Sequence, residues 1–250
     1  MKPLAAALLL LAAGALPAGT AHAAAEDPCA IPDSILTVDA ALPRVQERIR
    51  NSRTLPVLVI SSAKMAAGRT AASYPEQLGR ELSNRLSGHK VTVSVRSAPG
   101  ATTQEILPVM EAAMAQERPA LVVWQVGTTD AMRNIGPDAF GTALASGIER
   151  AHAGGADIVV MDMQYSLQTS QLIALQPYVT YVEWVTQNAE VFHFPRYEMM
   201  RHWIDHGRVA VDAESPSEKL KAYSFVHGCV GRLLAETVTA MIDRAAEAPQ

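Results

Sequence analysis

The chain has 250 residues, 49% of them hydrophobic, and its 21 basic and 25 acidic residues give a formal net charge of −4 at pH 7. A chain of this size can bury a large core. So weak a negative charge argues against nucleic acid or an anionic membrane surface as the main partner.

The first 23 residues are typical of a secretory signal peptide. A basic start at Met1-Lys2 precedes an apolar run, and Ala21-His22-Ala23 is an A-x-A cleavage signal. A membrane anchor is the alternative, but the run is short and contains Pro and Gly. We therefore expect a single domain of residues 24–250 that is periplasmic or secreted. We expect no later segment to be apolar for long enough to span a bilayer, and therefore no stable membrane insertion after cleavage.

Two cysteines, Cys29 and Cys229, lie in the exported part. In an oxidising compartment such a pair is often a disulfide. The bridge would tie the mature N-terminus to a helix near the C-terminus, and closing so long a loop contributes roughly 3–5 kcal/mol. Two separate buried thiols are the alternative. No Cys/His spacing is of the zinc-binding type, and we expect no metal and no cofactor.

Strand and helix patterns alternate along the exported part, which predicts βαβ units, a parallel sheet and helices on both of its faces. The predicted elements, in chain order, are a strand at 55–61, a helix at 73–88, a strand at 91–96, a helix at 102–116, a strand at 120–126, a helix at 137–153, a strand at 156–162, a helix at 175–189, a short strand at 190–194 and a helix at 222–246.

The ligand site of such a sheet lies beyond the carboxyl ends of its strands. That rule selects four loops, at residues 61–69, 96–101, 127–133 and 162–169. The segment before the last helix, residues 207–221, can reach the same edge.

These loops resemble the sequence blocks of the SGNH (GDSL-type) hydrolases, which are esterases and lipases. The segments that match the first three blocks are VLVISSAKMAAG with SYPEQLGREL, then VTVSVRSAPGATTQEIL and LVVWQVGTTDA. HGCVGRLLAETV resembles the helix that follows the last block, and IVVMDMQYS and FPRYEMMRHW resemble segments of exported bacterial members. The resemblance implies a flavodoxin-like three-layer α/β/α fold. It also implies a chemistry in which a serine attacks an ester, a histidine three residues after an aspartate takes its proton, and glycine and asparagine donors stabilise the oxyanion.

Residue by residue, the resemblance implies that the four family positions have changed. Ala63 falls at the nucleophile, Ser97 at the oxyanion glycine, Thr129 at the asparagine and Lys221 at the histidine, with Glu218 at the aspartate position. Alanine offers no nucleophilic oxygen. A lysine with its ordinary pKa of about 10.4 is protonated at neutral pH and cannot accept a proton.

Other residues of these loops are candidates for ligand binding in the cleft. They are Ser61, Lys64, Gly100, Asp130 and Asp162. Lys64 could neutralise an anionic ligand, or it could be a solvated loop residue. The two aspartates follow strands and could instead cap the next turn.

A second interpretation keeps an active serine. A one-residue shift of the first block would make Ser62 the nucleophile, and residues 61–64 also match the S-x-x-K motif, although its companion motifs are absent. The base would then come from His202, His206 or His227. The first two, one helical turn apart, could bind a metal or form a surface pair.

The sequence thus supports three hypotheses. The leading one is an exported SGNH-fold protein without the usual hydrolytic machinery, whose cleft binds a glycan, an acylated small molecule or an envelope protein. The alternative is an active esterase or acyl transferase that uses Ser62. The third is a structural module of an envelope complex.

Overall fold

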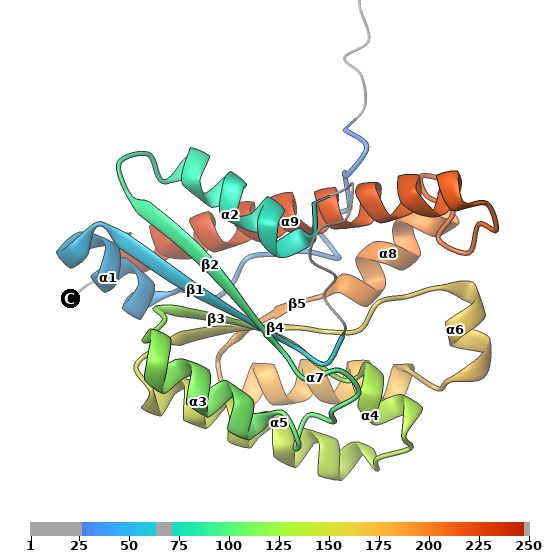
Figure 1. Cartoon of the computed structure of the whole chain (residues 1–250), viewed down its shortest axis with the longest axis horizontal. Coiled ribbons are helices and arrows are strands. Elements are labelled where there is room, and N and C mark those ends of the chain that lie inside the picture. Colours follow the sequence, from blue (N-terminus) through green and yellow to red (C-terminus); the bar gives the residue numbers. More distant parts are fainter. Residues whose placement is uncertain (1–26, 64–71, 248–250) are drawn as a thin grey trace, which may run out of the picture.

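The computed structural model of the protein describes residues 27–63 and 72–247. The expected signal peptide and Lys64 lie outside the described residues. Five parallel strands form the centre of the fold, in the order β2-β1-β3-β4-β5 (Figure 1). They are β1 (Thr54–Ser61), β2 (Lys90–Ser97), β3 (Leu121–Gln125), β4 (Asp157–Met161) and β5 (Phe192–Phe194).

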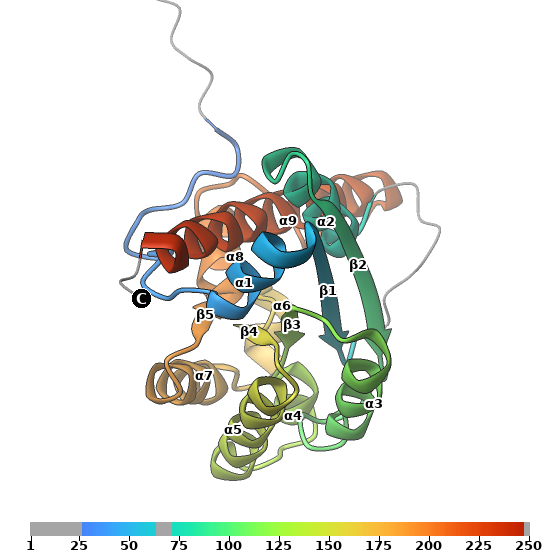
Figure 2. The same cartoon turned by 90° about the vertical axis from the view of Figure 1, so that its left-hand side faces the viewer.

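Helices cover both faces of this sheet. Figures 1 and 2 show α1, α2, α8 and α9 over one face and α3, α4, α5 and α7 over the other, which confirms the predicted three-layer α/β/α fold. The helices are α1 (Pro43–Ser52), α2 (Tyr74–Arg85), α3 (Leu107–Glu117), α4 (Thr128–Met132), α5 (Pro137–Ala153), α6 (Leu167–Leu172), α7 (Gln176–Asn188), α8 (Arg196–Asp205) and α9 (Pro216–Glu247).

The burial of the strands follows their place in the sheet. Every residue of β3 and β4 is buried, because these strands are covered by helices on both faces. Strand β2 lies at the edge of the sheet and is only partly buried. Trp124 of β3 is fully buried and belongs to the core.

Two helix boundaries differ from the sequence prediction. Helix α3 begins at Leu107 and not at 102, because residues 102–106 form hydrogen-bonded turns. Helix α9 begins at Pro216 and not near 222. The hydroxyl of Ser215 donates to the Glu218 carboxylate (2.6 Å) and accepts from the Glu218 amide (3.3 Å), which caps the helix six positions early.

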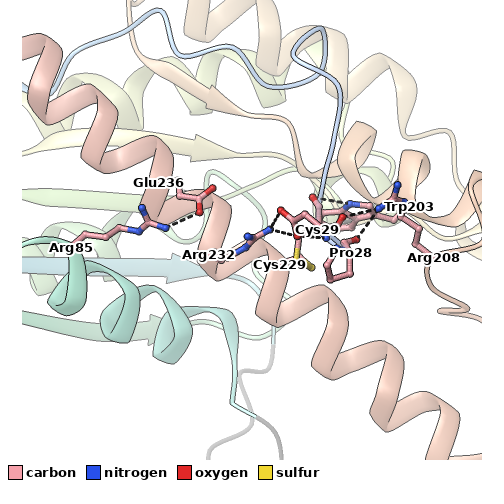
Figure 3. A network of polar contacts seen from close by, with 9 residues as sticks. Pro28, Cys29, Arg85, Trp203, Arg208, Cys229, Arg232 and Glu236 are labelled. Atoms are coloured by element: carbon pink, nitrogen blue, oxygen red, sulfur yellow. Dashed lines mark hydrogen bonds and ion pairs between the residues drawn. A yellow bond between two sulfur atoms is a disulfide. The ribbon is translucent and has the colours of Figure 1, made fainter. Parts of the chain in front are cut away.

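The predicted disulfide between Cys29 and Cys229 is confirmed, with 5.3 Å between the two Cα atoms. Figure 3 shows the polar contacts around it. Arg232 donates to both carboxylate oxygens of Asp27 (2.8 and 2.6 Å), and the indole of Trp203 donates to the carbonyl of Cys29 (3.3 Å). The first described residues are therefore fixed to both α8 and α9.

Helix α9 is long and apolar enough, by length and composition alone, to cross a bilayer, which corrects the expectation that no later segment is. Its apolar character has another cause, since 61% of the most apolar window is buried inside the protein. The apolar side chains of α9 therefore belong largely to the core.

Helices α2 and α9 pack closely at Gly231. A Cβ atom at this position would lie 2.9 Å from the backbone oxygen of Tyr74 and closer still to the Cβ of Gln77. At Gly228, one turn earlier, an added Cβ would meet nothing within 4 Å. The close contact of the two helices therefore requires glycine at 231 but not at 228.

We predict that Gly231→Ala destabilises the protein by about 1–3 kcal/mol, because the added methyl group overpacks the α2–α9 contact. Gly228→Ala is the matched control and should be neutral or stabilising by up to about 1 kcal/mol, since alanine favours helix. Urea denaturation of both variants measures the difference. Equal effects of the two substitutions would contradict this description of the helix contact.

Candidate functional site

The five strands end at nearly the same level of the sheet. Ser61 pairs with Ser97 on one side and with Gln125 on the other, Gln125 pairs with Met161, and Met161 pairs with Phe194. The loops that follow these residues therefore meet at one edge, as the parallel arrangement requires.

At this edge, Ser62 joins the first, second and third sequence blocks. Its carbonyl accepts a hydrogen bond from the amide of Gly100 (3.0 Å), and its hydroxyl accepts one from the Thr129 hydroxyl (3.1 Å). Within residues 27–63 and 72–247, neither a histidine nor a carboxylate is hydrogen-bonded to the Ser62 hydroxyl. The loops of the three blocks therefore meet at Ser62, as the resemblance implies, but no base among the described residues contacts the hydroxyl of this serine.

The neighbouring positions of these blocks differ in exposure. Ser61 is fully buried, and its hydroxyl accepts a hydrogen bond from the amide of Ala63 (3.0 Å), so it holds the loop and faces the interior. Ala63 and Ser97 are both exposed.

Asp130, a cleft-binding candidate, is 2% exposed. Its carboxylate accepts from the Thr103 amide (3.0 and 3.1 Å) and from the Thr103 hydroxyl (2.8 Å). Burial raises the pKa of this carboxyl, although the hydrogen bonds from Thr103 oppose that shift. Asp130 thus ties α4 to the turn before α3.

Asp162, which follows β4, is also buried inside the protein. One carboxylate oxygen accepts from the amide of Tyr197 (2.8 Å), at the beginning of α8, and the other lies 3.0 Å from the His193 ring nitrogen. Like Asp130, Asp162 therefore holds a neighbouring segment in place, in this case the beginning of α8.

The fourth block lies within α9. Glu218, at the family's aspartate position, is hydrogen-bonded to the capping Ser215, and Lys221 lies one turn further along on the exposed surface of the helix. No contact joins either residue to Ser62 within the described part of the chain.

The three candidate histidines have other contacts. The Nδ1 atom of His227 accepts from the amide of Tyr74 (2.9 Å), and its ring stacks on Tyr223 with 3.9 Å between centroids. The rings of His202 and His206 lie 4.1 Å apart on α8. No group of three possible metal ligands occurs in the part of the chain that the structure describes.

Sequence reasoning missed Arg196, the first residue of α8. It is 3% exposed and lies at the same edge of the sheet, after β5. The only signal was its place in the segment FPRYEMMRHW, which resembles exported SGNH proteins, because an arginine in a sequence usually indicates the surface.

A family model described as the non-GDSL lipase-like family matches residues 28–244. With its parallel sheet and its sequence blocks, the chain is an SGNH/GDSL-type, esterase-like protein, as the resemblance implied. Within that class, it belongs to the non-GDSL lipase-like family.

Several esterases are similar to this chain. Esterase TesA of Pseudomonas aeruginosa is 34% identical over 85 residues, which are 33% of this chain and only 42% of that protein. The crystal structure of TesA has a TM-score of 0.55 at 20% identity and covers 76% of this chain and 99% of its own. The crystal structure of the acetylxylan esterase Axe2 of Geobacillus stearothermophilus has a TM-score of 0.60 at 14% identity. The match covers 74% of this chain and 94% of Axe2. At such identities the two structures show the fold alone.

We predict that Asp130→Ala lowers the free energy of unfolding by about 2–3 kcal/mol, because it leaves two buried donors of Thr103 without an acceptor. Asp243→Ala, at an exposed position near the end of α9, is the control and should change stability by about 0.5 kcal/mol or less. Urea denaturation compares the two. A fully stable Asp130→Ala variant would show that this carboxylate is free for another role.

Proposed function

We propose that this protein is an exported member of its family that does not hydrolyse esters by the serine–histidine mechanism and that uses its cleft for binding. A glycan, an acylated small molecule or an envelope protein is the proposed partner. The proposal combines the changed residues at 63, 97, 129 and 221 with the contacts at the sheet edge.

One observation carries this proposal: among the described residues, the Ser62 hydroxyl is hydrogen-bonded to the Thr129 hydroxyl and to no base. A nucleophilic serine must donate its proton to a base. The Ser62 hydroxyl accepts from Thr129 at 3.1 Å, and no base among the described residues accepts from it. Within residues 27–63 and 72–247, no contact therefore activates its oxygen.

The same hydrogen bond affects oxyanion stabilisation. Threonine has one hydroxyl hydrogen, and Thr129 donates it to Ser62. An asparagine side chain at this position would have two donor hydrogens. The loss of one oxyanion donor costs about 2.7–4 kcal/mol of transition-state stabilisation.

The position of the fourth block supports the same conclusion. A base must lie within hydrogen-bond reach of the proton that it abstracts. Lys221 lies on the exposed side of α9, and the carboxylate of Glu218 is bonded to Ser215. Because α9 begins at Pro216, Glu218 and Lys221, which match the family's aspartate and histidine positions, are helical residues.

Export is proposed from two features of the chain. The first 23 residues have the pattern of a signal peptide, and Cys29 is bridged to Cys229. A disulfide persists in an oxidising compartment such as the periplasm.

The competing function is ester hydrolysis by Ser62. The similarity to Esterase TesA favours it, since 34% of the residues in the matched segment are identical. It requires a base that the contacts of Ser62 do not supply within the described residues.

We predict that hydrolysis of p-nitrophenyl acetate and p-nitrophenyl butyrate by the purified protein is at most weak and is unchanged, within about twofold, in Ser62→Ala. Removing a serine that forms an acyl-enzyme lowers kcat by several orders of magnitude, about 10⁶-fold in a well-studied serine protease. Circular dichroism of both proteins controls for folding. A loss of 100-fold or more in Ser62→Ala would instead establish the esterase.

A further inference from the structure

Arg196 is a buried cation that forms no ion pair with another described residue. Its side chain is at the beginning of α8, and only 3% of the residue is exposed. One terminal nitrogen lies 3.5 Å from the Gln164 side-chain oxygen, and the guanidinium lies 6.0 Å from the centre of the Tyr74 ring. Its Nε atom has no hydrogen-bond partner, and no carboxylate within the described ranges forms an ion pair with it.

A buried guanidinium is unfavourable unless an anion binds beside it. Burial lowers the pKa of the Arg196 guanidinium, yet arginine stays charged in proteins. A buried charge without a partner is costly. The carboxylate of Asp162 attracts it from a distance but is itself bonded to His193 and to the amide of Tyr197.

A cavity of about 270 Å³ lies beside Arg196, between the loop after β4 and helices α8 and α9. Figure 1 shows α6 and the beginning of α9 at the same end of the molecule, beyond the carboxyl ends of the strands. Arg196 lines the cavity, and so does Lys219, an exposed residue near the beginning of α9. Two cations therefore face one small space.

Asp212, the one acidic residue among the described residues that line this cavity, already has hydrogen-bond partners. The carboxylate of Asp212 accepts from the amide of Leu167 (3.1 Å) and from that of Gln168 (3.5 Å), at the beginning of α6. It makes no ion pair with Arg196 or Lys219 among the described residues. Its negative charge supports α6 and leaves both cations of the cavity without an ion-pair partner there.

The rest of the wall combines polar side chains, Gln164, Ser166 and His227, with an apolar part. Met200 and Val226 are buried side chains that line the cavity, and the ring of Tyr165 lines it from the loop after β4. A pocket with a few polar groups on an apolar wall is typical of a small-molecule site. Guanidinium groups bind carboxylates and phosphates through two parallel hydrogen bonds.

We propose that this cavity binds a small organic anion, whose carboxylate or phosphate group lies against Arg196 and whose apolar body lies against Tyr165, Met200 and Val226. The site goes beyond the proposed function. It shares no residue with the Ser62–Thr129 pair, so it stands whether or not the protein hydrolyses esters.

Isothermal titration calorimetry with benzoate, phenyl phosphate and the neutral benzamide tests the site. At least one of the two anions should bind ten times more tightly than benzamide, and the tighter anion identifies the head group. Arg196→Met should weaken the binding of that anion at least tenfold. Arg201→Met is the matched control, because Arg201 lies on the same helix but is exposed and paired with Glu198 (2.6 Å), and it should retain the affinity within twofold.

Lys219→Ala keeps the proposal testable if Arg196→Met does not fold, since this lysine is exposed. Lys219→Ala should weaken the binding of the anion about threefold or more and leave the binding of benzamide unchanged. Absence of binding by both anions, equal binding of all three compounds, or an anion affinity unchanged in Arg196→Met or in Lys219→Ala would overturn the proposal.

Discussion

The rest of the structure depends on one constraint, the register of the five parallel strands, which places their carboxyl ends side by side. From Val57 to Ser61, strand β1 is hydrogen-bonded to a neighbour on each side, and Ser61 is opposite both Ser97 and Gln125. Because the strands run in one direction, every following loop leaves from the same edge. Residues far apart in the sequence, such as Ser62, Gly100 and Thr129, therefore come into hydrogen-bond contact.

Polar groups at this edge mostly hold the loops in place. Ser61 accepts from the loop amide of Ala63, Asp130 accepts from Thr103, and Asp162 accepts from the beginning of α8. A buried carboxylate that accepts hydrogen bonds from backbone donors has its desolvation compensated and holds the loop that carries those donors. An edge with the form of a hydrolase cleft can thus be maintained by structural hydrogen bonds alone.

Buried parallel strands were predictable from the sequence because they are apolar along their whole length, and the disulfide because cysteine pairs are common in exported proteins. The beginning of α9 was not, since the residues from Glu218 to Lys221 match a family block, while Ser215 and Glu218 also form a helix-capping pair. Of the site, the meeting of the blocks could be expected from the parallel topology. Neither the Thr129–Ser62 hydrogen bond nor the burial of Arg196 could be expected, because both depend on tertiary packing.

The proposed absence of an activated serine is tested most directly by the intact mass of the mature protein after exposure to a fluorophosphonate, which reacts with an activated serine whatever its natural substrate. The account predicts no mass increase for the folded protein with its Cys29–Cys229 bridge intact. An adduct mapped to Ser61 or Ser62 would contradict it and would define a rewired hydrolase.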